Sequence, residues 1–253
     1  MFYDIFGGGS NVSLNVDSEF VYYNDIVHYV SDMFDEVKGG NADDLLRKVK
    51  DVINEYGLSK INEKGFLKLR QDYNNGRNSW EYFYALTCYS FNYQYRFNNN
   101  HEYNSSFGRN RSQFSKRMEK RFVDFVHRIN DIDIVFDNKD FRDIDLSDAD
   151  ENDLVYCDPP YLISVGNYND GKRGFKGWDE GDEKDLLGLL DKLDEQGARF
   201  ALSNVLEHKG QSNDLLKSWS KKYKIHYLDK DYSNCNYQVK NDKKSIEVLI
   251  TNY

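Results

Sequence analysis

The residues best suited to chemistry form a short turn, Asp158-Pro159-Pro160-Tyr161, directly after the apolar run from Leu154 to Cys157. The turn holds the only two prolines of the chain. A Pro-Pro pair fixes two successive φ angles near about −65° and supplies no N–H donor. The pattern therefore predicts a buried strand that ends in a rigid turn, with a carboxylate and an aromatic ring at its tip.

Such a turn can hold an amino group. Asp158 and the Pro159 carbonyl can accept its two hydrogens and draw the nitrogen toward tetrahedral geometry, while Tyr161 stacks on an extruded base. The chemistry that suits this arrangement is methyl transfer to the exocyclic amino nitrogen of a nucleobase, whose lone pair is delocalised into the ring. The alternative is an ordinary turn after a strand.

A second group of residues lies at the start of the chain. Met1 to Phe6 is predicted to be a strand, and it runs into Gly7-Gly8-Gly9-Ser10. Phe20 to Asp25 follows as a second strand that ends in an acidic residue. Strand, glycine loop, strand and acid predict a nucleotide-cofactor site, where the backbone approaches the ligand closely and the acid binds ribose hydroxyls. A flexible linker with an exposed Asp25 is the alternative.

Five segments of this chain resemble the Dam-type DNA adenine methyltransferases of the D12 class, close to their bacteriophage branch. The resemblance covers nearly the whole chain and implies methyl transfer from S-adenosylmethionine to the amino nitrogen of adenine in double-stranded DNA, within GATC. The segments that carry it are Asp4-Ile5-Phe6-Gly7-Gly8-Gly9, Val12-Ser13-Leu14-Asn15, Asn24-Asp25-Ile26, Asp158-Pro159-Pro160-Tyr161 and Leu202-Ser203-Asn204-Val205.

The resemblance also implies a Rossmann-like α/β methyltransferase fold and a role for each matching residue. Asp25 is expected to bind the cofactor ribose. The residues expected at S-adenosylmethionine are Asp4, Phe6, Gly7, Gly8, Gly9, Asp25, Ile26 and Asp158. The residues expected at the target adenine are Asp158, Pro159, Pro160 and Tyr161.

The start of the chain departs from the family pattern. Family members carry a segment before the glycine motif, with a Gly-Asn-Lys-type signature, that helps to bind the methionine end of the cofactor. Here the chain begins at the strand itself, so weaker cofactor binding is expected. One rival interpretation is a truncated or non-catalytic form that masks DNA sites. Another keeps the chemistry but transfers the methyl group to cytosine, RNA or a protein amide.

The net charge of −9 opposes binding to DNA phosphates, but the charge is unevenly distributed. The segment from Arg109 to Arg128 holds seven basic residues and two acidic ones, an excess of five positive charges. A basic stripe on an acidic protein predicts a docking surface for double-stranded DNA. A solvated helix face is the alternative.

The asparagine-rich stretch from Asn92 to Asn110 is predicted to be a β-hairpin or an ordered loop. By resemblance it lies where the family has its base-reading hairpin. Arg96 is the candidate for reading guanine in the major groove, with a phosphate contact as the alternative. Ser106-Phe107-Gly108 stands where the family has Pro-Phe-Gly, and a relaxed or altered target sequence is the alternative to GATC. The remaining residues expected at DNA are Asn98, Ser106, Phe107, Arg109, Asn110, Arg111, Lys116 and Arg117.

The periodicity of the whole chain predicts alternating helices and strands. Residues 1–42 and 132–253 are expected to form the catalytic domain, and 43–131 an inserted, mainly helical DNA-recognition subdomain containing the β-hairpin. The glycine-rich segment 166–174 is expected to close over the flipped base. Helices are predicted at 26–37, 42–56, 62–73, 80–88, 113–129, 180–195 and 213–222, and further strands at 132–136, 154–157, 199–203, 224–228 and 246–251.

Composition limits the remaining classes of protein. No apolar run approaches membrane-spanning length and no signal peptide is recognisable, which predicts a cytoplasmic protein of a bacterial or phage-infected cell. Neither a membrane nor an obligatory protein partner is expected. Three widely spaced cysteines and five histidines without ligand spacing predict no disulfide framework and no metal.

Overall fold

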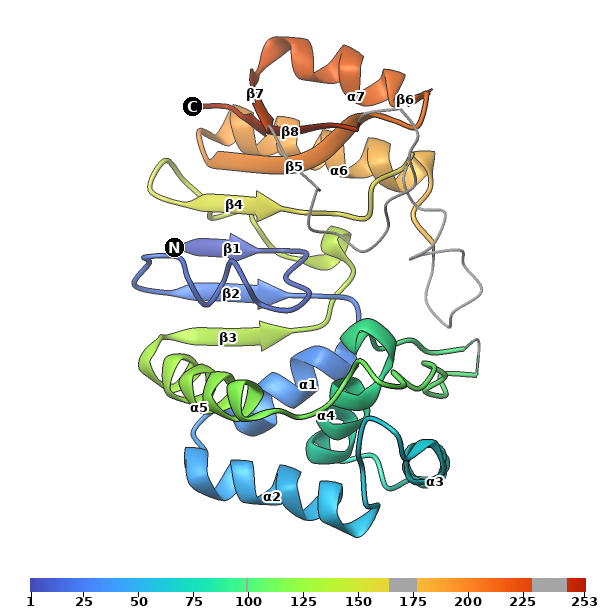
Figure 1. Ribbon diagram of the computed structural model, residues 1–253. Coiled ribbons are helices and arrows are strands. Elements are labelled where there is room, and N and C mark those ends of the chain that lie inside the picture. Colours follow the sequence, from blue (N-terminus) through green and yellow to red (C-terminus); the bar gives the residue numbers. More distant parts are fainter. Residues whose placement is uncertain (99, 164–176, 229–244) are drawn as a thin grey trace. The chain divides into compact units, whose positions relative to one another are not determined.

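The structure is a computed structural model that describes residues 1–98, 100–163, 177–228 and 245–253 of the 253-residue chain (Figure 1). The described residues form two compact units. The first contains residues 1–28, 137–163, 177–228 and 245–253, and the second contains 29–98 and 100–136. The borders predicted for the catalytic and DNA-recognition domains, at 42 and 132, remain a prediction.

A mixed sheet organises the first unit, with strands in the order β2-β1-β4-β5-β8-β7. Its centre is parallel: β1 (Phe2–Asp4) pairs with both β2 (Val21–Asn24) and β4 (Leu154–Cys157), and β4 pairs with β5 (Arg199–His208). Because parallel strands point the same way, the chain leaves β1, β2, β4 and β5 at one edge of the sheet. A central, mostly parallel sheet agrees with the predicted methyltransferase fold.

The outer part of the sheet is antiparallel. β8 (Ile246–Thr251) pairs antiparallel with β5 and with β7 (Lys224–Leu228). The short strand β6 (Gln211–Ser212) pairs with the end of β5. β3 (Ile134–Asp137) belongs to the second unit except for its last residue. The pairing of β5 with β8 shifts register between Val205 and Glu207, which lets β5 run on beyond the predicted end at Ser203.

Helix α6 (Glu180–Gln196) packs its leucines into the core of this unit. It begins with a capping box between Asp179 and Asp182 and ends at Gly197, whose φ of 86° is left-handed. The predicted helix at 213–222 is shorter than expected: α7 (Asp214–Trp219) gives way to a 3-10 turn, η3 (Ser220–Lys222). A further 3-10 turn, η2 (Phe141–Asp143), was not predicted.

The second unit contains five α-helices within the described residues, close to the predicted positions. Asn41, Asn62 and Ser115 cap three of them by accepting backbone N–H groups, and Asn and Ser are preferred at this position. Aromatic side chains fill the space between the helices, as at Phe83 and Tyr103. The helices are α1 (His28–Val37), α2 (Ala42–Glu55), α3 (Glu63–Asn74), α4 (Trp80–Tyr89) and α5 (Lys116–Asp131).

Between α4 and α5 the sequence predicted a β-hairpin or an ordered loop, and the described part of this stretch forms an ordered loop. It contains a 3-10 turn, η1 (Phe91–Tyr93), and two isolated antiparallel bridges, Ser90 to Phe107 and Phe97 to Tyr103. Asn92, Tyr93 and His101 have positive φ angles of 56°, 57° and 60°. Left-handed residues interrupt extended backbone, so a continuous ladder cannot form there.

Two further predictions concern mobility and the membrane. The segment 166–174, expected to close over a flipped base, lies outside the described residues. Among the helices that the structure describes, none has the length and apolar character needed to cross a membrane.

Candidate active site

The Asp158–Tyr161 turn lies where the chain leaves β4, beside the loops that leave β1 and β5. The strand register places Asp4 opposite Tyr156, and Cys157 opposite Leu202. The three segments quoted for the resemblance at Asp4, Asp158 and Leu202 therefore meet at one edge of the sheet. These segments follow strands that are far apart in the sequence, and the parallel pairing of those strands brings them together.

The side chains of this turn are connected by hydrogen bonds. The Tyr161 hydroxyl donates to Asp158 Oδ1 at 2.7 Å and lies 3.3 Å from Ser203 Oγ of β5. Burial and the adjacent Asp158 charge raise the pKa of Tyr161 well above its usual range, so the hydroxyl stays a neutral donor. Asp158 is exposed, whereas Pro159 is buried and Tyr161 half-buried. The carboxylate is thus both oriented and accessible.

Asp4, the last residue of β1, is a buried carboxyl group next to this turn. Ser13 Oγ donates to its Oδ2 at 2.5 Å, and no described residue is a hydrogen-bond partner of its Oδ1. The pKa of Asp4 is raised to about 6, chiefly by burial and in addition by the charges of Asp158 and Asp25, with the hydrogen bonds from Ser13 acting in the opposite direction. Three carboxyl groups at the ends of β1, β2 and β4 therefore interact electrostatically.

The glycine loop wraps around Asp25, which follows β2. The Gly8 N–H donates to Asp25 Oδ2 at 2.9 Å, and the Val27 N–H donates to Oδ1 at 2.8 Å. Burial raises the pKa of Asp25, and these two backbone hydrogen bonds partly offset the effect. Because Asp25 binds Val27, residues 25 and 26 form a turn, and α1 starts at His28 instead of the predicted position 26.

Glycine is required in this loop for two reasons. Gly8 has a φ of 47°, in the left-handed region. A Cβ at Gly7 would lie 2.2 Å from the ring of Tyr23, whose hydroxyl donates to the Gly8 carbonyl at 2.7 Å. The loop is therefore packed tightly against β2, and it differs from the flexible linker considered as an alternative. The predicted cofactor residue Ile26 is exposed at its side.

Three aromatic rings pack together beside the glycine loop. Phe6 lies 5.5 Å from Phe141 of η2 and 5.6 Å from Trp178, measured between ring centroids. Phe6 and Trp178 are partly buried, and Phe141 is buried. Sequence analysis singled out Phe6 alone. Phe141 and Trp178 carried no signal because each stands outside a recognisable motif, and the contact forms only in the folded chain.

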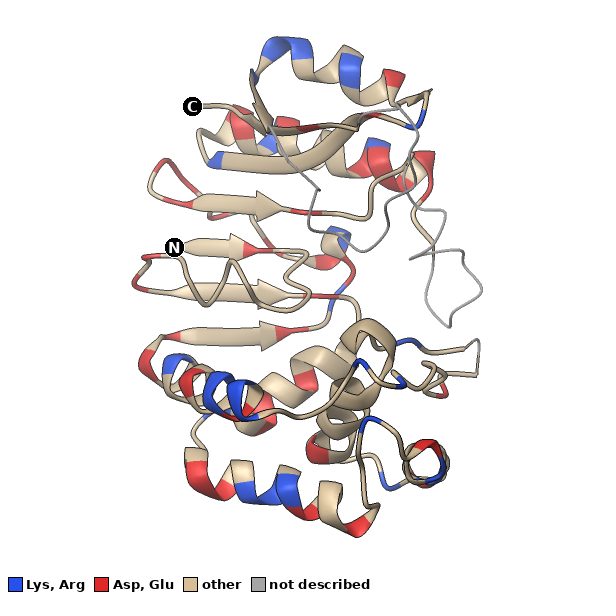
Figure 2. Ribbon diagram, in the orientation of Figure 1, with Lys and Arg blue, Asp and Glu red and all other residues tan. Residues whose placement is uncertain are grey.

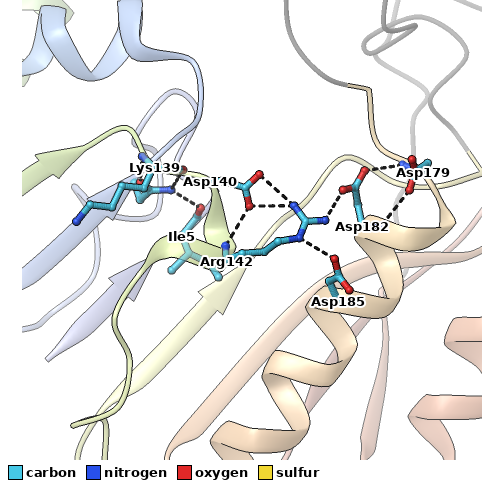
Figure 3. A network of polar contacts seen from close by, with 8 residues as sticks. Ile5, Lys139, Asp140, Arg142, Asp179, Asp182 and Asp185 are labelled. Carbon is cyan, nitrogen blue, oxygen red and sulfur yellow. Dashed lines mark hydrogen bonds and ion pairs between the residues drawn. The ribbon is translucent and has the colours of Figure 1, made fainter.

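Polar contacts hold the surrounding loops in place (Figure 3). The side-chain amide of Asn24 donates to the carbonyls of Ile5 and Lys139 at 3.1 and 3.0 Å, and the Lys139 N–H donates to Asn24 Oδ1. Arg142 forms ion pairs with three carboxylates from two segments, Asp140, Asp182 and Asp185. These contacts fix η2, and with it Phe141, against the start of α6.

The site fits S-adenosylmethionine. This cofactor carries a sulfonium, an ammonium group and ribose hydroxyls, and the carboxyl groups of Asp4, Asp25 and Asp158 favour cations. The tight glycine loop, the partly exposed Phe6 ring and the buried Asp4 Oδ1, which has no hydrogen-bond partner among the described residues, suit a polar ligand with an adenine base. Among the described residues, no group of three or more His, Cys, Asp or Glu side chains could hold a metal ion.

The residues predicted to contact DNA bases lie in the second unit, on the loop between α4 and α5. Arg96 is half-buried and donates to Gln94 Oε1 at 2.8 Å. Asn98 organises its own turn, because its Oδ1 accepts the N–H groups of Asn100 and Glu102. Phe107 is only 9% exposed and packs 5.4 Å from Phe66. These hydrogen bonds and this aromatic contact stabilise the conformation of the loop.

The remaining predicted DNA contacts are mostly exposed. Arg109 pairs with Glu63, and the N–H of Asn110 donates to the Lys60 carbonyl at 2.7 Å. The exposed residues of this group are Ser106, Arg109, Asn110, Arg111, Lys116 and Arg117.

Helix α5 carries most of the basic stripe, shown in blue in Figure 2. Two of its three acidic residues pair with lysines of the stripe, Glu119 with Lys116 and Asp124 with Lys120. Glu119 also pairs with Lys50 of α2. The exposed Arg117 has no ion-pair partner among the residues that the structure describes.

An α/β sheet with a glycine loop after its first strand and an acidic Pro-Pro-Tyr turn after another defines a methyltransferase-type site. The model of the D12 class N6 adenine-specific DNA methyltransferase family matches residues 1–234. The chain belongs to this family, and the prediction of an adenine-specific DNA methyltransferase is confirmed at the level of the family.

Several curated proteins are similar over all of this chain. It is 48% identical over 252 residues to the type II methyltransferase M.FokI of Planomicrobium okeanokoites and 45% identical over 254 residues to the modification methylase StsI of Streptococcus sanguinis. It is 35% identical over 253 residues to the modification methylase LlaI of Lactococcus lactis subsp. lactis. The chain spans 39% of the length of each. The GATC target and the bacteriophage branch stay predictions.

Proposed function

We propose that this chain transfers a methyl group from S-adenosylmethionine to the exocyclic amino nitrogen of adenine in double-stranded DNA. The observation that carries the proposal is the Asp158–Tyr161 turn, with its oriented and exposed carboxylate, next to Asp4 and the glycine loop. Membership of the D12 class supports adenine as the target, and relatives named modification methylases support a role in restriction-modification.

The turn orients the target amino group. Asp158 and the Pro159 carbonyl accept its two hydrogens, and the ring of Tyr161 stacks on the flipped base. In this orientation the nitrogen lone pair is released from the adenine ring and would be available to the electrophilic methyl group that bound S-adenosylmethionine would supply. The amino group then loses one proton to solvent or to Asp158. The hydrogen bond from Tyr161 holds Asp158 in one orientation during these events.

The residues at the ends of β1 and β2 hold the cofactor. When bound, S-adenosylmethionine supplies an electrophilic methyl group on a positively charged sulfur. Asp25 binds the ribose hydroxyls, and the backbone of Gly7, Gly8 and Gly9 allows close approach. Phe6 contributes an aromatic surface, Asp4 a buried negative charge and Ile26 an apolar contact.

In this proposal the DNA-recognition subdomain is residues 43–131, which lie within the second unit. Arg96 reads a guanine through two hydrogen bonds, after releasing Gln94. Arg109, Arg111, Lys116 and Arg117 contact phosphates, which set affinity and carry no sequence information. The other predicted contacts, at Asn98, Ser106, Phe107 and Asn110, shape the loop that presents Arg96.

The product of the reaction tests the proposal. The chain is incubated with mixed-sequence duplex DNA and S-adenosylmethionine that carries a deuterated methyl group, and the DNA is digested to nucleosides for mass spectrometry. We expect labelled N6-methyladenine. Labelled N4-methylcytosine instead would show that the amino group of cytosine is the target. DNA binding without any labelled base would support a site-masking role.

The target sequence needs its own measurement. GATC is proposed from the resemblance to Dam-type enzymes alone. Mapping the methylated adenines of a treated, unmethylated genomic DNA would give the target directly. Methylation confined to GATC would support that assignment, and methylation in any other shared sequence would replace it.

A further inference from the structure

Glu183 is a buried charged residue for which the proposed chemistry has no use. It lies in the first turn of α6 and its exposed fraction is 0%. Three neutral donors bind its carboxylate: Trp178 Nε1 at 2.8 Å, Asn213 Nδ2 at 2.9 Å and Asn204 Nδ2 at 3.2 Å. A buried carboxylate is costly unless hydrogen bonds satisfy it, so its orientation and that of its donors determine each other.

The three donors come from different parts of the first unit. Asn204 follows Ser203 in β5, and Ser203 Oγ lies 3.3 Å from the Tyr161 hydroxyl. Asn213 caps α7, because its side-chain oxygen accepts the Leu216 N–H at 3.0 Å. Glu183 therefore joins Trp178 to the strand beside the Asp158–Tyr161 turn.

Trp178 forms part of the aromatic group at the glycine loop. Its ring meets Phe6 edge to face, with centroids 5.6 Å apart and an interplanar angle of 81°. It also lies 5.6 Å from Phe141. Phe6 and Trp178 both keep partly exposed rings, and aromatic faces attract cations and stack on bases.

The start of α6 is anchored independently of Glu183. Asp179 and Asp182 form the capping box, and Asp182 also pairs with Arg142, as Figure 3 shows. The Arg142 guanidinium lies 4.4 Å from the centroid of the Phe141 ring. The helix that carries Glu183 and the ring next to Trp178 are thus fixed to each other.

We propose that Trp178 contacts bound S-adenosylmethionine and that Glu183 is the positioning residue that fixes its indole. The inference rests on the proposed function, since it names a further residue of the same cofactor site. Its geometric basis is that the Trp178 ring contacts Phe6, which directly precedes the glycine loop, while the Trp178 indole N–H donates to Glu183.

The test uses tryptophan fluorescence and titration calorimetry with S-adenosylmethionine on the 253-residue chain. The chain has three tryptophans, so Trp80 and Trp219 remain as internal references in Trp178→Phe. Both Glu183→Gln and Trp178→Phe should raise Kd about tenfold, as expected for one lost hydrogen bond to a charged group. Trp178→Phe should also abolish most of the fluorescence change that the wild type shows on binding.

Two further variants separate positioning from general damage to the fold. Glu195→Gln, exposed near the other end of α6, should bind like the wild type. In the double variant Glu183→Gln/Trp178→Phe, Kd should be within about twofold of either single variant, because both remove the same interaction. Additive losses would show that Glu183 acts without Trp178 and would overturn the positioning role.

The remaining outcomes distinguish this inference from the proposed function. Wild-type Kd in both single variants, or an undiminished fluorescence change in Trp178→Phe, would overturn the inference and leave the proposed function standing. Absence of calorimetric binding by the wild type would overturn the proposed cofactor itself, and the inference with it.

Discussion

At the scale of a single residue, Asp4 is a buried carboxyl group whose negative charge destabilises the ligand-free protein. Its carboxyl group is 1% exposed, and its pKa is raised to about 6 chiefly by burial. A carboxyl group whose pKa is higher in the folded than in the unfolded chain favours folding when protonated, so this contribution is lost as the pH rises through about 6. A bound cation would offset the cost.

Replacing Asp4 by asparagine should therefore stabilise the ligand-free protein at neutral pH. We expect Asp4→Asn to raise the free energy of unfolding at pH 7.5 by about 2 kcal/mol, with the difference shrinking as the pH falls below 6. Urea unfolding from pH 5 to 8 measures this, with the exposed Asp148→Asn as control. A difference that does not change with pH would contradict the role of burial.

Tyr161 combines two contributions that substitutions can separate. Tyr161→Phe keeps the ring but removes the hydroxyl that donates to Asp158, and should lower kcat about tenfold, as for one charge-assisted hydrogen bond. Tyr161→Ala also removes the stacking surface, worth roughly 1–3 kcal/mol, and should be slower still. Single-turnover rates measure both, with the exposed Tyr227→Phe as control. Equal rates for the Phe and Ala variants would contradict stacking.

At the scale of the element, the glycine loop owes its shape to packing against β2. A Cβ at Gly7 would lie 2.2 Å from the Tyr23 ring, whereas a Cβ at Gly9 would lie 3.5 Å from its nearest neighbour, an ordinary contact. Gly7→Ala should lower the free energy of unfolding by about 1–3 kcal/mol, and Gly9→Ala by less than about 0.5 kcal/mol. Thermal unfolding compares them; equal losses would show that the loop is not tightly packed.

The elements predicted most accurately from sequence are those with their own local signals. The strands at 154–157, 224–228 and 246–251 agree with the structure to the residue, because each is a short run rich in apolar and β-branched side chains bounded by polar residues. The loop between α4 and α5 was harder to predict, since its aromatic residues suggest a strand while left-handed residues such as Asn92 interrupt it.

The site was predictable only as far as its motifs extend. Asp4, the glycine loop, Asp25 and the Asp158–Tyr161 turn stand in recognisable local patterns, so sequence analysis found them. The roles of Phe141, Trp178 and Glu183 depend on contacts between distant segments. The sequence around these residues does not predict their contacts, because the contacting residues are brought together only by the pairing of the strands and the packing of α6.

At the scale of the whole molecule, an acidic chain concentrates basic residues on one helix. Replacing Arg117 and Arg121 of α5 by glutamine should weaken DNA binding and reduce the slope of log Kd against log salt by about two, since each phosphate contact contributes about 0.9. Fluorescence anisotropy at several salt concentrations measures this. The double variant Lys184→Gln/Lys192→Gln of α6 removes the same net charge, and an equal effect there would indicate a nonspecific origin.

The central claim is that Asp158 and its turn perform methyl transfer to the amino group of adenine. The most direct test compares single-turnover methyl transfer by the wild type and Asp158→Ala on duplex DNA, with DNA affinity measured alongside. Loss of the orienting carboxylate should lower the rate at least about a hundredfold while DNA affinity changes less than about threefold. Methylation at the wild-type rate by Asp158→Ala would contradict the account.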